Sequence, residues 1–394
     1  MSQPLAGITV LDLTQIYQGP YCGFLMATAG ADVIKIEPRG GERLRGAGGA
    51  KTQLSFATLN SNKKSITLDL KQERGKVLLK QLVLKADILL ENYAPGVMDR
   101  LGVGWEVLHE INPALIYVSG TGYGLSGPDR DMLAMDHTIQ ATSGVMSSTG
   151  DPDRPPGRAG GAPSDIMGGI HMYGGAMTAL VGRHATGQGT LVEVSMLEAM
   201  YFTLSTEFSA YHATGKIPQR NSARSPSSVV PYSRYECSDG GYVAIICVAQ
   251  GHWHKILKVI GREDLIGHED YEKPGKRLKN EPAVNEMLNA WAITVTRDDA
   301  FNTMREAGVP VAPIRNLEEV RNDPHMHARG SLQKLEHPQM GEVILPNNPI
   351  RYSEYDRAEL EFYPEPGQNN HEIYGELLGL APDEVAALLS DAVI

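Results

Sequence analysis

Two stretches near the start of the chain, Ile8 to Leu13 (ITVLDL) and Ala31 to Glu37 (ADVIKIE), have the composition of β-strands. The first alternates apolar with polar residues and is rich in β-branched side chains, which is typical of a strand. Between them, the pair Gly19-Pro20 predicts a turn, and the small residues from Tyr21 to Thr28 predict a helix. A strand, a helix and a second strand in this order favour a mostly parallel sheet covered by helices.

The same alternation continues through the first 120 residues. Glu73 to Lys85 places its apolar residues on one face of a helix, and Ala86 to Glu91 and Ala114 to Ser119 are apolar runs typical of buried strands. We therefore predict an α/β fold. Further elements are predicted as follows: helices at about Asp136 to Met146, Ile166 to Arg183 and Ser195 to His212, a Gly/Pro-rich loop at Gly150 to Pro163, and a strand at Thr190 to Val194.

The length of 394 residues allows two or three domains. Residues 214–231 hold Lys and Arg among Ser, Pro and Asn, which indicates a linker. We predict a large α/β domain whose first part covers residues 1–215, a linker at 216–231, a smaller domain at 232–323 and a return to the large domain at 324–394. Within the smaller domain, Asp239-Gly240-Gly241 between two strand-like runs predicts a hairpin.

Charge and composition exclude several classes of protein. The chain has 36 Lys and Arg against 47 Asp and Glu, a formal net charge of −11, which argues against a nucleic-acid binder. The sequence contains no run of 18 or more apolar residues, so no membrane span is predicted. No secretory signal is visible. The three cysteines form no CxxC pair, which favours a reducing, cytoplasmic location.

The 42 glycines and 24 prolines gather in clusters, not at a fixed period, which excludes collagen and low-complexity chains. Asp165 stands where one such cluster ends and a helix begins. Such an Asp commonly caps the helix, but Ser164 is already a suitable cap. The helix that follows contains Gly168, Gly169, Gly174, Gly175 and Ala176. Because each interior glycine costs about 0.5–1 kcal/mol, we expect a backbone or ligand to approach closely, with Asp165 as a candidate nucleophile.

Three other local patterns carry less weight. Residues 122–127 (GYGLSG) match GxGxxG, but residues 128–131 (PDRD) predict a loop where a dinucleotide site needs a helix. His252-Trp253-His254 has no Cys or carboxylate partner at ligand spacing, so no metal site is predicted. Cys22 has no nearby His in the sequence to activate it, which favours a buried structural thiol.

Several segments together resemble the class III CoA-transferases, of the formyl-CoA transferase and carnitine CoA-transferase type. The resemblance covers essentially the whole chain, and the order and spacing of the segments make it specific. The segments are 10–14 (VLDLT) with Gly19-Pro20, 30–37 (GADVIKIE), 60–65 (NSNKKS) with 68–71 (LDLK), 86–87 (AD) with 91–96 (ENYAPG), 122–124 (GYG) with 127–128 (GP), and 163–165 (PSD) with the glycine-rich helix.

The resemblance implies a Rossmann-like large domain with a mostly parallel sheet, a smaller α+β domain and an interlocked homodimer. It also implies that Asp165 attacks an acyl-CoA thioester, releases CoA thiolate and forms an acyl-aspartyl anhydride, without a cofactor or metal. Gly168 and Gly169 would let the thioester approach and offer N–H groups to the oxyanion. The acyl-CoA and a carboxylic acid, for example succinyl-CoA with a small dicarboxylate, are the implied substrates.

The resemblance implies that the CoA-binding positions of the family correspond to Arg39, Leu68, Lys71, Asn92, Tyr93, Arg100 and Leu101 in this sequence. Around the nucleophile it points to Tyr17, Gln18, Asp136, His137, Gly168 and Gly169. There are departures: formate-type members have a Gln where this chain has Tyr17, and their tetraglycine loop is absent from the smaller domain. Both departures argue against oxalate and formate as the substrate pair.

The α-methylacyl-CoA racemases share this fold and are the alternative. They use a His-Asp pair to remove and return the α-proton. The racemase His matches Met135, beside Asp136, and His137 faces about 200° around the predicted helix from residue 135. A racemase would lack its base here, so CoA transfer is the favoured prediction.

Overall fold

The computed structural model describes residues 3–46, 50–221, 229–337 and 340–394. The chain divides into two compact units, the first made of Met1–Val145, Ala159–Thr203 and Asp323–Ile394, the second of Met146–Arg158 and Leu204–Asn322. Helix α10 (Ser205–Thr214), which the sequence places in the large domain, falls in the second unit. Residues 222–228 of the predicted linker lie outside the described residues.

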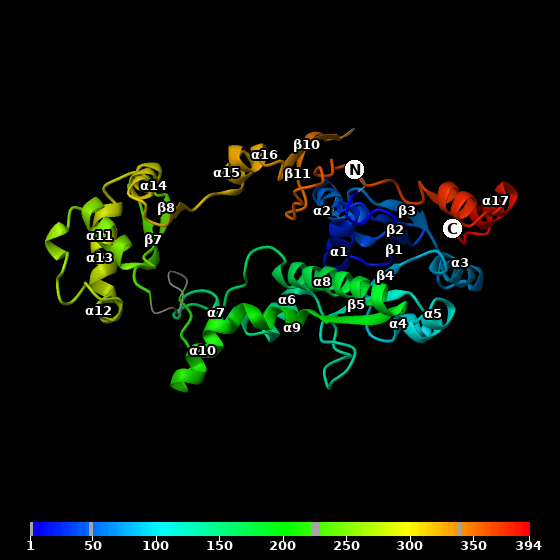
Figure 1. Ribbon diagram of the computed structural model, residues 1–394, viewed down its shortest axis with the longest axis horizontal. Helices are drawn as coiled ribbons and strands as arrows, with labels where there is room; N and C mark the ends of the chain where they lie inside the picture. The colour runs from blue at the N-terminus through cyan, green and yellow to red at the C-terminus, as the bar shows by residue number, and fades with distance from the viewer. Residues whose placement is uncertain (1–2, 47–49, 222–228, 338–339) are drawn as a thin grey trace. The chain divides into compact units, whose positions relative to one another are not determined.

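The first unit is built on a six-stranded parallel sheet with the strand order β3-β2-β1-β4-β5-β6 (Figure 1). The predicted α/β fold with a parallel sheet is confirmed. The strands are β1 (Thr9–Asp12), β2 (Asp32–Glu37), β3 (Lys64–Thr67), β4 (Ile88–Glu91), β5 (Ile116–Thr121) and β6 (Thr190–Ser195). The strand order reverses between β1 and β4, so the loops that follow these two strands leave the sheet in opposite directions and open a crevice between them.

Successive residues of the central strands face two separate cores. Val10 of β1 packs with α1 (Gln18–Ala27) and α8 (Pro163–Thr186) on one face of the sheet. Leu11 packs with α3 (Glu73–Val83) on the other face. Both faces of the central strands are therefore buried, as is usual for a parallel sheet covered by helices.

The other helices of the first unit connect the strands or follow them. They are η1 (Arg43–Arg45), α2 (Ala50–Asn60), α4 (Val97–Arg100), α5 (Trp105–Ile111), α6 (Asp136–Thr142), α9 (Met196–Tyr201), α16 (Pro324–Ala328), the π-helix His371–Leu377 and α17 (Pro382–Ser390). α7 (Val145–Ser148) begins at the last residue of a first-unit segment and continues into the second unit.

Three local predictions differ from the structure. Gly19 and Pro20 lie inside the first turn of α1, where a missing backbone N–H costs nothing, so the predicted turn is wrong. The predicted helix from Asp136 to Met146 is two helices, separated at Gly144, which has a φ of 91°. The helix predicted from Ser195 to His212 is interrupted by a 3₁₀ turn at Phe202–Leu204.

The second unit has a small antiparallel sheet in the order β7-β8-β9. The predicted hairpin forms between β7 (Tyr232–Glu236) and β8 (Tyr242–Ile246), and β9 (Val311–Pro313) pairs with β8. Trp253, which is fully buried, packs in the core between this sheet and the helices. The helices are α10, α11 (Gln250–Val259), η3 (Glu263–Leu265), α12 (Pro274–Lys279), α13 (Glu281–Ala292), α14 (Arg297–Glu306) and α15 (Leu317–Arg321).

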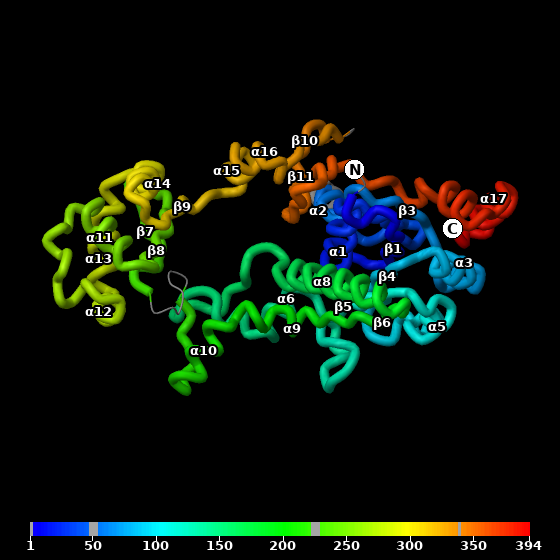
Figure 2. Tube along the Cα trace, viewed as in Figure 1, coloured from blue at the N-terminus to red at the C-terminus, as the bar shows by residue number. Residues whose placement is uncertain are grey.

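The C-terminal segment returns to the first unit and covers the edge strand β3 (Figures 1 and 2). The Asn370 side chain accepts a hydrogen bond from the backbone N–H of Thr67 and donates one to its hydroxyl, each at 2.9 Å. The Tyr374 hydroxyl donates to the Thr67 carbonyl at 2.8 Å. Before it, β10 (Leu332–His337) and β11 (Gly341–Pro346) form an antiparallel pair.

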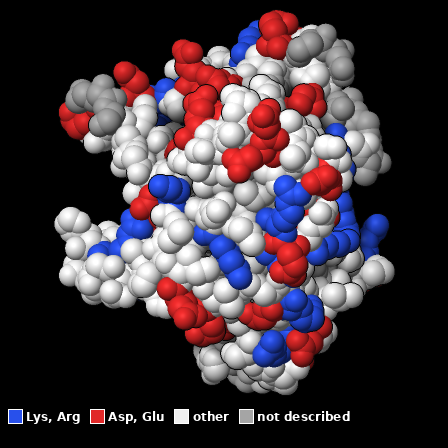
Figure 3. All heavy atoms as spheres, turned by 90° about the vertical axis from the view of Figure 1, so that its right-hand side faces the viewer, with Lys and Arg blue, Asp and Glu red and all other residues white. Residues whose placement is uncertain are grey.

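The surface of the first unit is mixed in charge. On the face that Figure 3 shows, acidic and basic side chains are interspersed and form no single basic stripe. Within the described ranges, no helix is long and apolar enough to cross a membrane.

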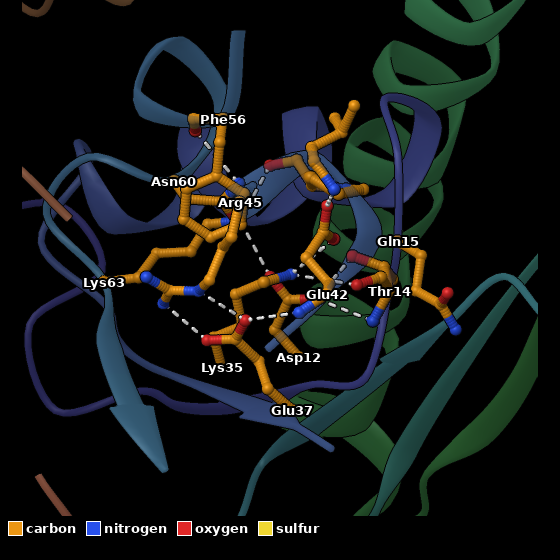
Figure 4. Close-up of polar contacts among 12 residues, drawn as sticks. Asp12, Thr14, Gln15, Lys35, Glu37, Glu42, Arg45, Phe56, Asn60 and Lys63 are labelled. Atoms are coloured by element: carbon orange, nitrogen blue, oxygen red, sulfur yellow. Dashed lines mark hydrogen bonds and ion pairs between the residues drawn. The ribbon is translucent and has the colours of Figure 1, made fainter. Parts of the chain in front are cut away.

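Charged side chains from three of the resemblance segments meet inside the first unit (Figure 4). Asp12, at the end of β1, and Lys63, just before β3, are both buried, and Asp12 Oδ2 lies 2.7 Å from Lys63 Nζ. Lys63 Nζ also donates to the carbonyl oxygen of Pro20 and to Oδ1 of Asn60, each at 2.9 Å. The ion pair therefore fixes the start of α1 against two strands.

A second pair lies beside the first. Arg45 donates two hydrogen bonds to Glu37, at 2.7 and 2.6 Å, and its guanidinium lies 4.3 Å from the centre of the Phe56 ring. Lys35 Nζ donates to the carbonyl oxygen of Thr14 at 2.9 Å. Burial alone would raise the pKa of Asp12, but Lys63 and Lys35 outweigh it and hold that pKa below its ordinary value.

The Asp12–Lys63 pair should contribute strongly to stability. Asp12→Asn leaves a buried ammonium without its counter-charge, and we expect the free energy of unfolding to fall by about 3–5 kcal/mol. Lys63→Met should have a similar cost, and the double variant should lose less than the sum. Urea denaturation measures all three variants. As a control, Asp32→Asn breaks the half-exposed pair with Lys64 and should cost at most about 1 kcal/mol. Additive losses at Asp12 and Lys63 would contradict the coupling.

Candidate active site

A cavity of about 350 Å³ lies at the carboxyl edge of the sheet, at the point where the strand order reverses. Ligands of open α/β sheets commonly bind at this place. The walls come from the loops after β1, β4 and β5, the first turn of α8 and the segment before α6. The lining residues are Gln15, Ile16, Gln18, Arg43, 92–95, 120–122, Arg130, 132–135, Asp165 and Met196.

Asp165 lies in the first turn of α8 and is 8% exposed. It lines the cavity, and its carboxylate has no hydrogen bond or ion pair with the residues that the structure describes. The helix cap is Ala162, so the Asp165 side chain is not used as a cap. Burial, together with the nearby Asp136, raises the pKa of Asp165 to about 7. A buried carboxylate that faces a cavity without a partner is a candidate for chemistry.

Asp136, and not Asp165, accepts a hydrogen bond from a backbone N–H group in the first turn of α8. Its Oδ1 accepts the backbone N–H of Ser164 at 2.8 Å, and its Oδ2 accepts a hydrogen bond from Gln140 Nε2 at 2.7 Å. Gln140 in turn accepts the backbone N–H of Ala159 at 2.9 Å. Asp136 therefore positions the first turn of α8 and adds negative charge beside Asp165.

Gly168 and Gly169 lie one turn after Asp165 and face α1. A Cβ atom on Gly168 would lie 2.8 Å from Gln18 Nε2, and one on Gly169 would lie 2.5 Å from the Gln18 carbonyl oxygen. The sequence predicted that a backbone or a ligand approaches this helix closely. At Gly168 and Gly169 the close neighbour is α1.

The loop between β1 and α1 is held by Asn92. Asn92 Oδ1 accepts the backbone N–H of Gln15, and its Nδ2 donates to the Gln15 carbonyl, both at 2.8 Å. The next residue, Ile16, lines the cavity with a φ of 69°, which is strained for a β-branched residue. Tyr93 lines the same cavity and is half-buried. The predicted pair Asn92 and Tyr93 is therefore at the cavity, with the Asn92 amide already occupied by the loop.

The other predicted CoA positions do not line this cavity. Arg39, Lys71 and Arg100 are exposed and follow β2, β3 and β4, at the same edge of the sheet. Leu68 is buried in the core, and Leu101 is half-buried against it. Of the predicted neighbours of the nucleophile, Gln18 lines the cavity, whereas Tyr17, at the start of α1, and the exposed His137 are absent from its lining.

Two arginines that line the cavity, Arg43 and Arg130, are not among the site residues that the sequence predicts. Arg43 belongs to the turn η1, and Arg130 follows the GxGxxG-like loop, where no helix begins. That loop nevertheless supplies Gly122 to the lining. The only signal for these residues was their place after a strand, since carboxyl ends of parallel strands meet at one edge.

His254, of the His252-Trp253-His254 pattern, and Cys22 both contact neighbouring protein groups. His254 Nε2 lies 3.0 Å from Glu272. No group of three or more His, Cys, Asp or Glu side chains suited to a metal occurs among the described residues. Cys22 is buried against the sheet, and burial raises the pKa of its thiol.

Comparison with known proteins agrees with this fold. The family model described as CoA-transferase family III matches residues 5–371. Succinyl-CoA–D-citramalate CoA-transferase of Chloroflexus aurantiacus is 34% identical over 396 residues, which cover 100% of this chain and 98% of that protein. Acetyl-CoA:oxalate CoA-transferase of Acetobacter aceti is 37% identical over 358 residues, which cover 90% of each chain. The crystal structure of a CaiB/BaiF family protein from Brucella suis superposes with a TM-score of 0.82 at 33% identity and covers 96% of this chain and 100% of that one.

With a matching family model over most of its length and relatives that align end to end, the chain belongs to CoA-transferase family III. It is therefore a CoA-transferase.

The environment of Asp165 predicts its titration. Carbon-13 signals of labelled aspartates, assigned by difference from Asp165→Asn, should show Asp165 titrating with a pKa of about 7. Asp136→Asn keeps an oxygen to accept the Ser164 N–H but removes the neighbouring charge, so the pKa of Asp165 should fall. Glu73→Gln removes a distant surface charge and should leave it unchanged. An Asp165 that titrates near the ordinary value of about 4 would contradict this account of the site.

Proposed function

We propose that the chain transfers CoA from an acyl-CoA donor to a carboxylic acid through covalent intermediates on Asp165. The observation that carries this proposal is the Asp165 carboxylate, which is buried, unpaired among the described residues and placed on a cavity at the switch point of the sheet. A carboxylate with hydrogen-bond or ionic partners would be a weaker nucleophile, because those partners stabilise its charge.

The proposed reaction proceeds in four balanced transfers. An Asp165 oxygen attacks the thioester carbonyl carbon, the C–S bond breaks, and CoA leaves as thiolate, which gives a mixed anhydride. The thiolate attacks the Asp165 carbonyl carbon and releases the donor acid as carboxylate. The acceptor carboxylate then attacks this aspartyl-CoA thioester and releases the thiolate again. Finally, the thiolate attacks the acceptor's carbonyl carbon, which forms the new acyl-CoA and restores Asp165. No cofactor is consumed.

The proposed CoA site follows the carboxyl edge of the sheet. Three exposed cations, Arg39, Lys71 and Arg100, follow the strands β2, β3 and β4. Although the chain has a net charge of −11, these cations could bind the negatively charged polyphosphate of the CoA nucleotide. Leu68 and Leu101 anchor this edge of the sheet to the core. Asn92 acts in this proposal as a positioning residue for the β1–α1 loop.

A homodimer is part of the proposal, as the family resemblance implies. Val181 of α8 and Phe202 of the 3₁₀ turn Phe202–Leu204 are each 75% exposed, and such exposed apolar side chains favour coverage by a second copy. The reducing cytoplasm is the proposed location, since Cys22, Cys237 and Cys247 are all free.

Removal of the nucleophile should abolish covalent chemistry. Incubation with succinyl-CoA followed by hydroxylamine should convert Asp165 to its hydroxamate, which peptide mass spectrometry detects. Asp165→Ala should form no adduct and lose transfer activity on the order of 10³-fold or more, while acyl-CoA still binds. Thermal unfolding should not occur at a lower temperature, because the substitution removes an unpaired buried charge. A variant with full transfer activity would refute the mechanism.

The arginines of the cavity predict the class of acceptor. Arg43 and Arg130 offer two cations, so with succinyl-CoA as donor, small dicarboxylic acids should accept CoA faster than monocarboxylic acids of equal length. Mass spectrometry of the new CoA thioesters gives the relative rates. Faster transfer to monocarboxylic acids would contradict this substrate class.

Deuterium exchange at the acyl α-carbon without any acceptor acid would instead favour the racemase, although Met135 offers no base.

A further inference from the structure

Gln18 has a side chain whose position the fold alone does not explain. It is 2% exposed, at the start of α1, and its amide nitrogen Nε2 is buried without a hydrogen-bond partner among the described residues. A buried donor left unsatisfied costs about 1–3 kcal/mol. Such a group in a folded protein calls for a reason, of which a missing ligand is one.

The surroundings hold this amide in place. A Cβ atom on Gly120, at the end of β5, would lie 2.9 Å from Gln18 Nε2, and one on Gly168 of α8 would lie 2.8 Å from it. The glycines thus leave room for the amide from two sides. Burial between the two elements restricts the side chain, so its donor is pre-oriented.

The Gln18 side chain also belongs to the lining of the site. Gln18 and Asp165 both line the cavity, and Asp165 lies one helical turn before Gly168, on the same face of α8. No hydrogen bond links the two side chains in the structure, so the nucleophile does not use the Gln18 donor.

We propose that the Gln18 amide donates a hydrogen bond to the acyl oxygen of the thioester or anhydride that Asp165 attacks, a role that rests on the proposed function. When the Asp165 oxygen bonds to the carbonyl carbon, the carbonyl electron pair moves to the acyl oxygen. The Gln18 N–H stabilises that negative charge until the C–S bond breaks and the pair leaves on sulfur. A donor held ready where charge develops lowers the barrier without reorganisation.

The test compares two substitutions with a matched control. Gln18→Met keeps a similar volume and removes both N–H donors, whereas Gln18→Glu keeps the shape and replaces the donor with an acceptor. Gln333→Met alters a partly buried glutamine of β10 that is outside the cavity, where its oxygen accepts the Leu360 N–H at 2.9 Å. The readout is the single-turnover rate of the hydroxylamine-trapped Asp165 adduct at saturating succinyl-CoA, with the dissociation constant of succinyl-CoA measured alongside.

We expect Gln18→Met to slow adduct formation about 10²–10³-fold, with succinyl-CoA affinity within about threefold and no loss of thermal stability. Gln333→Met should form adduct at the wild-type rate. A Gln18→Met rate within about threefold of wild type, or a change confined to affinity, would overturn the assignment.

Gln18→Glu supplies a second readout, the pH dependence of the rate of adduct formation, which would not change if Gln18 had only a structural role. A protonated carboxyl group has one O–H donor and a carboxylate has none, so its rate relative to wild type should rise as the pH falls. A ratio that stays flat would also overturn the assignment, even if Gln18→Met fails to fold. If wild type itself forms no adduct, the proposed function fails; if wild type does and Gln18→Met matches it, only the role of Gln18 fails.

Discussion

The buried ion pair between Asp12 and Lys63 is the interaction on which the site depends. It lies beneath the carboxyl edge of the sheet and joins the end of β1 to the segment before β3, and the Lys63 ammonium also binds the Pro20 carbonyl in the first turn of α1. Two opposite charges in a dry interior tolerate little change in separation, because either charge alone would be costly. The β1–α1 loop, which forms one wall of the cavity, therefore has a defined path.

From that anchor, α1 presents its first turn to α8. Gly168 and Gly169 bring the two helices together, and α8 in turn carries Asp165 to the cavity with no hydrogen-bond partner among the described residues. Asp136 satisfies the end of α8 in its place. The paired charges below the cavity stabilise the fold. The Asp165 carboxylate, unpaired among the described residues, and the strained backbone of Ile16 both lower the stability of the fold at the site.

Much of this arrangement was predictable, and for identifiable reasons. The strands Thr9–Asp12 and Asp32–Glu37 are rich in β-branched residues and alternate with helical segments, and this alternation favours a parallel sheet. Asp165 was identifiable because glycines that weaken a helix need a compensating contact. The partner in that contact, α1, could not be named, since close approach depends on residues distant in the chain. Arg43 was missed for the same reason.

By itself the sequence determined the α/β class, the alternation of strands and helices, the family and the aspartate at the mouth of a glycine-rich helix. These features are written in periodicity, composition and local spacing, which act over a few residues. Only the tertiary structure decided that Asp12 and Lys63 pair, that Asn92 holds the β1–α1 loop, and that Gln18 lines the cavity while its buried donor has no partner among the described residues. Hydrogen bonds and ion pairs between residues far apart in the chain depend on distances that only folding sets.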